Sequence, residues 1–270
     1  MKVLKNISVL KKAINNISSL GFVPTMGGLH NGHISLIKES KKKCKKTIVS
    51  IYINPKQFNN KKDFSNYPRN LIKDLNLLKK INPDYVFLPT TKEMYKNNNK
   101  KKIILLKSDK ILCAKMRKGH FEGVLNIMHR FIKLIKPKYI FMGEKDFQQL
   151  YLVKKFIKNR YKCKIYSCKT IRDKNYIALS TRNFLLSKKD LNIVGKISRI
   201  LKNARQKIKR TNSPFLYLNI LKKKLVKQFK IKIDYLELCN DHNLQESNPK
   251  KKYRIMIAFY IKKVRLIDNF

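Results

Sequence analysis

The stretch that most constrains this chain is Pro24-Thr25-Met26-Gly27-Gly28-Leu29-His30-Asn31-Gly32-His33. It follows the apolar run Gly21-Phe22-Val23, typical of a short strand, and precedes Ile34, Leu36 and Ile37 at helical spacing. A strand, a glycine turn and a helix start direct backbone N–H groups and the positive end of the helix dipole at one point. Two histidines three residues apart lie on one face of that helix start. The stretch therefore predicts an anion site in an α/β fold.

The histidine pair has other interpretations when its spacing is considered alone. His30 and His33 can be an incidental pair on a helix, with no chemical role. A zinc site would need a third ligand, and none stands at a usual spacing. The rest of the chain must decide between these interpretations.

The composition is that of a folded protein. The chain has 270 residues, of which 43% are hydrophobic, enough for a sizeable core. No apolar run approaches the roughly 20 residues of a membrane span, and residues 1–6 lack the apolar region of a signal peptide. The cysteines are five in number and scattered, which indicates reduced thiols. We therefore expect a cytoplasmic protein that does not span a membrane.

The net charge of +48 has two explanations. A basic nucleic-acid-binding protein would carry such a charge. However, the lysines are spread along the whole chain, and they accompany many Asn, Ile, Tyr and Phe residues, all of which share A- and T-rich codons. Genome composition therefore explains the charge as well as a partner does, and we do not expect nucleic acid to be the partner.

Strand and helix patterns alternate through about residue 171, which predicts a Rossmann-like, doubly wound parallel sheet. Helical patterns cover 7–20, 68–81 (with Pro68 in the first turn), 122–135 and 150–160, and strand patterns cover 21–23, 47–53, 84–89, 103–106, 138–143 and 164–171. Beyond them, two helical patterns (191–209 and 215–229) precede strands at 233–238, 254–261 and 264–267. We expect an N-terminal domain over 1–175 and a smaller α+β domain over 176–270.

Four polar clusters outside the histidine turn have side chains suited to a nucleotide site. They are Asn54-Pro55-Lys56-Gln57-Phe58, Met116-Arg117-Lys118-Gly119-His120-Phe121-Glu122-Gly123, Gly143-Glu144-Lys145-Asp146 with Gln148 and Gln149, and Ala178-Leu179-Ser180-Thr181-Arg182-Asn183. The first and third follow predicted strands, at the sheet edge where α/β proteins bind ligands. Each also has a structural alternative: a strand terminator, a surface loop, a helix capped by Asp146, and a loop leading to an N-cap at Ser187.

Taken together, these motifs resemble the pantothenate synthetase family (pantoate–β-alanine ligases, AMP-forming) of the HxGH nucleotidyltransferase superfamily. The similarity covers essentially the whole chain, through VPTMGGLHNGH, SIYINPKQF, DFSNYPRNLIKDL, MRKGHFEGV, FMGEKDFQQL, ALSTRN and RLIDN in order. Several motifs in the right order are far more specific than any one of them. The resemblance implies a Rossmann-like ATP-binding and pantoate-binding domain followed by a small lid domain.

The family's reaction is implied as well. Pantoate and ATP would give pantoyl adenylate and pyrophosphate, and β-alanine would then give pantothenate and AMP. The implied catalytic residues are His33, His30, Lys145 and Arg182, with His33 as proton donor to the leaving pyrophosphate. The implied ATP-binding residues are Met26, Gly27, Gly28, Leu29, His30, Asn31, Gly32, His33, Gly143, Glu144, Lys145, Asp146, Ile171, Leu179, Ser180, Thr181 and Arg182.

The acceptor side of the site follows from the same resemblance. It implies that Gln57 and Gln149 bind pantoate and that Asn54 lies near the β-alanine entry. It further implies that Arg117 and His120 belong to a flexible loop near the site. It also implies a homodimer and Mg²⁺ held mainly by phosphates and water, with Asp74 as an outer-shell partner.

The chain departs from the family pattern at a few positions. Gly28 replaces a usual alanine, Asn31 a common acidic residue and Lys118 a usual proline, while Lys174-Asn175-Tyr176 replaces a turn that often contains glycine. None removes a residue assigned to chemistry. Two alternative functions stay open: an HxGH nucleotidylyltransferase with a phosphorylated acceptor, and a basic nucleic-acid-binding protein.

Overall fold

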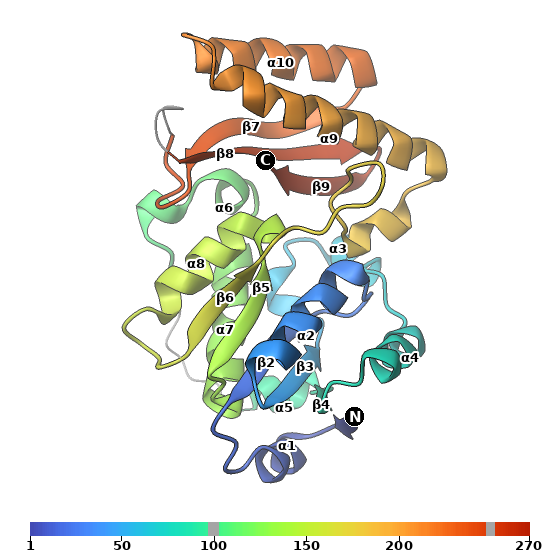
Figure 1. Cartoon of the computed structure of the whole chain (residues 1–270), viewed down its shortest axis with the longest axis vertical. Helices are drawn as coiled ribbons and strands as arrows, with labels where there is room; N and C mark the ends of the chain where they lie inside the picture. Colours follow the sequence, from blue (N-terminus) through green and yellow to red (C-terminus); the bar gives the residue numbers. More distant parts are fainter. Residues whose placement is uncertain (97–102, 247–251) are drawn as a thin grey trace. The chain divides into compact units, whose positions relative to one another are not determined.

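The computed structural model describes residues 1–96, 103–246 and 252–270 (Figure 1). The polar loop expected at 97–102 lies outside the described residues. The chain divides into two compact units, a first unit of Met1–Glu144 with Leu152–Lys169 and a second unit of Lys145–Tyr151 with Thr170–Phe270. The domain boundary near residue 175 stays a prediction.

A parallel sheet in the order β1-β4-β3-β2-β5-β6 forms the centre of the first unit. Its strands are β1 (Lys2–Leu4), β2 (Leu20–Thr25), β3 (Lys46–Ile51), β4 (Tyr85–Phe87), β5 (Tyr139–Gly143) and β6 (Lys164–Cys168). From β2 the chain adds strands first on one side and then on the other, so the order reverses between β2 and β5. The carboxyl ends of β2 and β5 are therefore the switch point at which doubly wound sheets bind ligands. The predicted fold class is confirmed.

Helices cover both faces of this sheet (Figure 1). The helices of the first unit are α1 (Ile7–Ala13), α2 (Asn31–Lys43), α3 (Lys61–Ser65), α4 (Leu71–Ile81), α5 (Thr91–Tyr95), α6 (Leu112–Met116) and α7 (His120–Ile135), with 3₁₀ turns η1 (Pro55–Gln57) and η2 (Lys107–Asp109). On one face, Ile37 of α2 and Leu78 of α4 pack with Phe141 of β5. On the other face, the Phe131 ring of α7 lies 5.3 Å from that of Phe22 in β2. Burial on both faces explains the nearly continuous apolar runs of these strands.

The chain passes between the units around η3 (Glu144–Asp146), α8 (Phe147–Ile157) and the segment after β6. The second unit then consists mainly of an antiparallel sheet, β7 (Lys232–Asn240), β8 (Tyr253–Ile261) and β9 (Val264–Asn269), with α9 (Lys188–Ile208), α10 (Pro214–Phe229) and the 3₁₀ turn η4 (Thr181–Leu185). The two long helices pack on one face of the sheet (Figure 1). Ile197 of α9, Leu225 of α10 and Ile257 of β8 are fully buried between them. The smaller α+β unit is thus confirmed, as is the helix cap at Ser187.

Some of the element predictions were wrong, for local reasons. Residues 103–106 form no strand, and Ile104 there is 74% exposed. The helix expected from Pro68 begins at Leu71, because the Asn70 side chain accepts the Lys73 N–H and fixes the N-cap. The helix expected over 7–20 ends at Ala13, and the three-residue edge strand β1 was not predicted.

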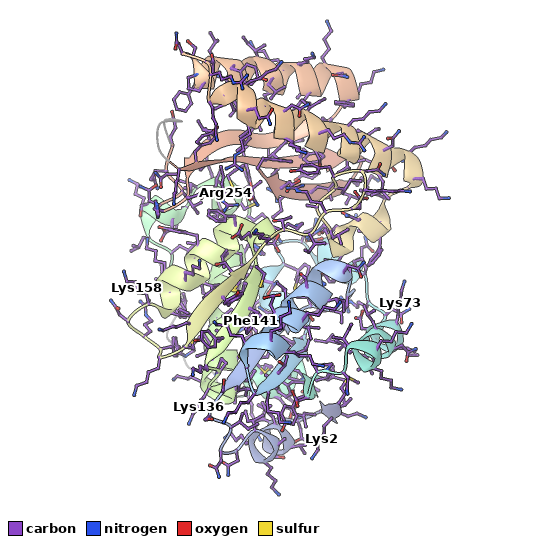
Figure 2. All side chains as sticks on the ribbon, viewed as in Figure 1. Lys2, Lys73, Lys136, Phe141, Lys158 and Arg254 are labelled. Atoms are coloured by element: carbon purple, nitrogen blue, oxygen red, sulfur yellow. The ribbon has the colours of Figure 1, made fainter. Side chains whose placement is uncertain are left out.

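Cationic side chains extend from the elements of both units (Figure 2). Lys73, Lys136 and Lys158 are exposed, whereas Phe141 lies inside the first unit. Among the described residues, no helix is both long enough and apolar enough to cross a bilayer.

Candidate active site

The turn after β2 is shaped by two glycines and one buried carboxylate. Gly27 and Gly28 have φ angles of +81° and +61°, in the left-handed region that favours glycine. Asp74 of α4 is 3% exposed, and its carboxylate accepts the N–H groups of Gly28 at 2.9 Å and Leu29 at 2.8 Å. The expectation that the backbone N–H groups of this turn face an incoming anion was therefore wrong for Gly28 and Leu29. The positive φ also gives a reason for glycine at position 28.

His30 and His33 cap the N-terminus of α2. His30 is the N-cap residue, and its Nδ1 accepts the Gly32 N–H at 3.1 Å, while His33 Nδ1 accepts the His30 N–H at 3.4 Å. The two ring centroids are 4.1 Å apart, which confirms that the rings share one face. An imidazole that accepts at Nδ1 carries its proton on Nε2. Both rings are thus neutral N–H donors at Nε2, which suits contact with phosphate oxygens.

The turn after β3 contains a network centred on Asn54, which is 1% exposed. Its Nδ2 donates to Gln57 Oε1 at 3.2 Å and to the Gly123 carbonyl at 3.1 Å, and its Oδ1 accepts from the Tyr95 hydroxyl at 2.8 Å. Because Gln57 Oε1 accepts from Asn54, the Gln57 amide presents Nε2, which lies 2.8 Å from Met26 Sδ in the histidine turn. Asn54 therefore orients Gln57.

Tyr95 is part of this network, and sequence reasoning missed it. Burial raises the pKa of its phenol, so the hydroxyl keeps the proton that it donates to Asn54. The Arg130 guanidinium lies 4.5 Å and the Lys56 ammonium 4.1 Å from the centre of its ring. No pattern in the sequence marks a tyrosine at the end of a five-residue helix.

His120, paired with Arg117, contacts the backbone of Gln57. His120 is the first residue of α7 and is 8% exposed. Its Nε2 lies 2.9 Å from Arg117 Nη1 and its Nδ1 lies 2.6 Å from the Gln57 carbonyl. A guanidinium only donates, so Nε2 accepts and the Nδ1–H donates to the Gln57 carbonyl. The segment expected to be a loop thus continues into a helix whose first side chain fixes the backbone of Gln57.

In the second unit, the Lys145 ammonium lies 3.0 Å from Asp146 Oδ1, and the Lys145 carbonyl accepts from Asn269 Nδ2 at 2.9 Å. Backbone hydrogen bonds link the other predicted site residues of this unit. Leu179 N donates to the Ile171 carbonyl at 3.0 Å, and Ser180 Oγ accepts the Arg182 N–H at 3.3 Å as the cap of η4. The structure therefore brings Ile171 next to the segment of Ser180 and Arg182.

The segment Lys174-Asn175-Tyr176 forms a turn without the glycine that the family often has there. Tyr176 has a φ of +68°, an uncommon conformation for a non-glycine residue. Asp173 Oδ1 accepts the N–H groups of Asn175 and Ile177, both at 2.9 Å, and the Arg172 guanidinium lies 4.6 Å from the centre of the Tyr176 ring. Local hydrogen bonds and ring contacts thus stabilise the turn.

The predicted site residues fall into two groups, which belong to different units. In the first unit, at the carboxyl ends of neighbouring strands, are Met26, Gly27, Gly28, Leu29, His30, Asn31, Gly32, His33, Asn54, Gln57, Gly143 and Glu144. In the second unit are Lys145, Asp146, Gln149, Ile171, Leu179, Ser180, Thr181 and Arg182.

A doubly wound sheet with paired imidazoles on a glycine turn at its switch point defines a nucleotide-binding α/β enzyme. The family model described as pantoate-beta-alanine ligase matches residues 2–270. The pantothenate synthetase of Clostridium botulinum is 39% identical over 97% of this chain and 94% of that protein. The chain therefore belongs to the pantoate–β-alanine ligase family, and it is a ligase that uses ATP.

Solved structures agree with this assignment. A pantoate-beta-alanine ligase from Francisella tularensis, complexed with beta-gamma ATP and beta-alanine, has a TM-score of 0.86 and 38% identity, covering 100% of this chain and 97% of that one. A pantothenate synthetase from Thermus thermophilus has a TM-score of 0.92 and 28% identity, covering 100% of this chain and 99% of that one.

Proposed function

We propose that this chain joins pantoate to β-alanine through pantoyl adenylate, with His30 and His33 as phosphate-contacting donors. The observation that carries the proposal is the pair of Nε2–H imidazoles on the turn after β2, with the fixed amide of Gln57 against Met26 of the same turn. Imidazole N–H groups suit a polyphosphate, and an amide suits the hydroxyl and carboxylate groups of pantoate. The relative from Francisella tularensis, which binds an ATP compound and β-alanine, supports the same substrates here.

The first step needs alignment more than acid–base chemistry. A pantoate carboxylate oxygen attacks the α-phosphorus, the bond from phosphorus to the bridging oxygen breaks, and its electron pair leaves with pyrophosphate. The nucleophile is already an anion, so no general base is required. Donors that face the phosphate oxygens lower the barrier by stabilising the charge that develops there. We assign this role to His30 and His33, with the Nε2–H of His33 donating a hydrogen bond to the leaving pyrophosphate.

In the second step the β-alanine amine attacks the acyl carbon of pantoyl adenylate. The carbon–oxygen bond to the phosphate breaks, AMP leaves with that electron pair, and the amine nitrogen releases a proton to water as the amide forms. Gln57 and Gln149 hold pantoate in this proposal. Asn54 acts through Gln57, because both ends of its own amide bond to protein groups.

The second unit supplies cations in this proposal. Lys145 and Arg182 hold phosphates, with the Ser180 hydroxyl beside them. By the family resemblance, the segment of Arg182, which forms the 3₁₀ turn η4 here, is comparable to the KMSKS loop of related synthetases. Ile171 and the residues from Gly143 to Asp146 contact the adenosine.

Mg²⁺ enters the proposal as part of the substrate, bound to the triphosphate and water. Asp74 is assigned to the turn and not to the ion, since each of its oxygens already accepts a backbone N–H. We further propose a homodimer, as in the family resemblance, and a cytoplasmic location. The cysteines, all free and buried, support a reducing compartment.

The direct test measures pyrophosphate release from ATP, Mg²⁺ and pantoate, before and after β-alanine is added. We expect a stoichiometric burst that becomes steady turnover, with AMP formed only when both substrates are present. Absence of pyrophosphate with pantoate, together with nucleotidyl transfer to a phosphorylated acceptor, would instead identify the alternative nucleotidylyltransferase.

The role of His33 is tested by His33→Ala. Loss of one positioned hydrogen-bond donor to the leaving pyrophosphate lowers the burst rate by about 10²-fold or more. His242→Ala, in an exposed turn of the second unit, is the matched control and keeps the wild-type burst. A near-normal burst in the His33 variant would refute the assignment.

A further inference from the structure

The backbone of Lys145 is bonded to the last strand of the chain. Asn269, near the C-terminus, donates from Nδ2 to the Lys145 carbonyl at 2.9 Å, across 124 residues of sequence. Both residues belong to the second unit. We propose that Asn269 is a positioning residue for Lys145, fixing the point from which its ammonium reaches the phosphates. This inference rests on the phosphate-binding role proposed for Lys145.

The Asn269 side chain has one orientation open to it. It is 4% exposed, and its Oδ1 accepts from Arg254 Nη1 at 2.9 Å. Since Arg254 can only donate, the amide oxygen must face Arg254, and the amide nitrogen must face the Lys145 carbonyl. The same guanidinium lies 4.1 Å from the centre of the Phe147 ring, two residues after Lys145. Arg254 therefore contacts the Lys145 segment and sets the amide that holds it.

The backbone of Asn269 is fixed as well. Arg172 forms a two-pronged ion pair with the buried Asp268, with nitrogen–oxygen distances of 2.7 and 2.9 Å. Arg172 Nη2 also donates to the Asn269 carbonyl at 3.0 Å, and Asp268 Oδ1 accepts the Asn269 N–H at 2.8 Å. A paired, hydrogen-bonded guanidinium and carboxylate hold both backbone groups of Asn269. The amide is thus a rigid support.

A lysine ammonium is a point charge on a flexible stem, so its reach depends on where its backbone is anchored. Lys145 stands in a single 3₁₀ turn, η3, and the hydrogen-bond geometry of such turns is poorer than that of an α-helix. The hydrogen bond from the Asn269 amide of β9 to the Lys145 carbonyl restricts the movement of this turn. A displacement of about 1 Å at this point is enough to lower a rate that depends on alignment.

A double-mutant cycle tests whether Asn269 acts through Lys145. Asn269→Ala lowers the burst rate of pyrophosphate release by about tenfold, the effect of losing one alignment contact. In the Lys145→Ala background the same change has little further effect, because the group that it positions is already gone. If the two losses multiply instead, Asn269 does not act through Lys145, and the inference fails.

Asn269→Asp, measured in folded protein, tests the positioning of Lys145 with a side chain of nearly the same size. Its carboxylate keeps an acceptor for Arg254 but places an oxygen against the Lys145 carbonyl, so we expect a lower melting temperature and, in protein that is still folded at the assay temperature, a burst lowered about tenfold. An unchanged burst in this variant would overturn the inference. Asn240→Ala is the matched control, because that side chain caps a turn at the end of β7 through His242 N and does not touch Lys145. A wild-type protein without a burst would refute the proposed function itself, so the two failures are distinguishable.

Discussion

At the scale of single residues, Asp74 is the group on which the histidine turn depends. Its carboxylate accepts two buried backbone N–H groups of that turn. Gly27 is part of the same arrangement, since a β-carbon there would lie 3.0 Å from Asp74 Oδ2. The Asp74 carboxylate thus shapes the turn, whereas His30 and His33 are the residues that we assign to the phosphates of the substrate.

We therefore expect Asp74→Ala to affect stability and chemistry together. Two N–H groups lose a charged acceptor, which costs about 2–4 kcal/mol of unfolding free energy. Because the turn carries His30 and His33, the burst rate falls by about 10- to 100-fold in folded protein. Denaturant unfolding and burst kinetics on the same sample measure both effects.

Asp84→Ala is the matched control. Asp84 also accepts a backbone N–H, that of Thr47 at 2.9 Å, but it lies just before β4, at the amino edge of the sheet. This variant loses stability and keeps its burst rate. If Asp74→Ala also keeps its burst rate, Asp74 serves stability alone.

At the scale of elements, the approach of α7 to η1 sets the position of Gln57. A β-carbon on Gly123 would lie 2.2 Å from the Lys56 carbonyl oxygen and 2.9 Å from Gln57 Cα. Glycine is therefore required for this helix to reach the turn. His120 and Asn54 complete the same contact with hydrogen bonds.

Gly123→Ala is expected to push α7 away from η1. Overpacking of this kind costs about 1–3 kcal/mol. Because Gln57 moves with η1, the KM for pantoate rises by about tenfold while the KM for ATP changes little. Gly195→Ala in α9, where the nearest atom is 3.1 Å away, is the matched helix control and leaves the KM for pantoate unchanged. An unaltered KM in the Gly123 variant would mean that η1 does not depend on this contact.

The same elements show what the sequence could and could not predict. Hydrophobic periodicity and glycine placement were enough for strands β2 to β6, the helix after β2 and the shared face of His30 and His33, because these depend on local spacing, but not for the edge strand β1. The contact of Tyr95 with Asn54 joins residues 41 apart, and that of Asn269 with Lys145 joins residues 124 apart. Such contacts depend on the tertiary arrangement, which no local pattern encodes.

At the scale of the whole molecule, charge is the dominant property. The chain has 64 Lys and Arg residues against 16 Asp and Glu residues, so most cations lack an acidic partner even if every carboxylate forms an ion pair. Like charges repel one another more strongly in the compact state than in the extended one. Added salt should therefore stabilise the fold.

The expected result is a higher melting temperature when NaCl is raised from about 10 mM to about 100 mM, since the Debye length then falls from about 30 Å to about 10 Å. A rise of roughly 3–6 °C corresponds to a modest gain in unfolding free energy for a chain of this size. Sucrose at equal osmolality serves as the control for non-ionic effects. A melting temperature that falls with salt would show that attractive pairs outweigh the repulsion.

The division of the chain has a consequence for protein engineering. The second unit is built from two pieces of sequence, because Lys145–Tyr151 joins it ahead of Thr170–Phe270. A fragment cut once, at any point after β6, would leave Asn269 and Arg254 without Lys145 and Phe147. Chimaeras between relatives should therefore exchange both pieces at once, and a split enzyme should keep the β5–α8 junction with the C-terminal half.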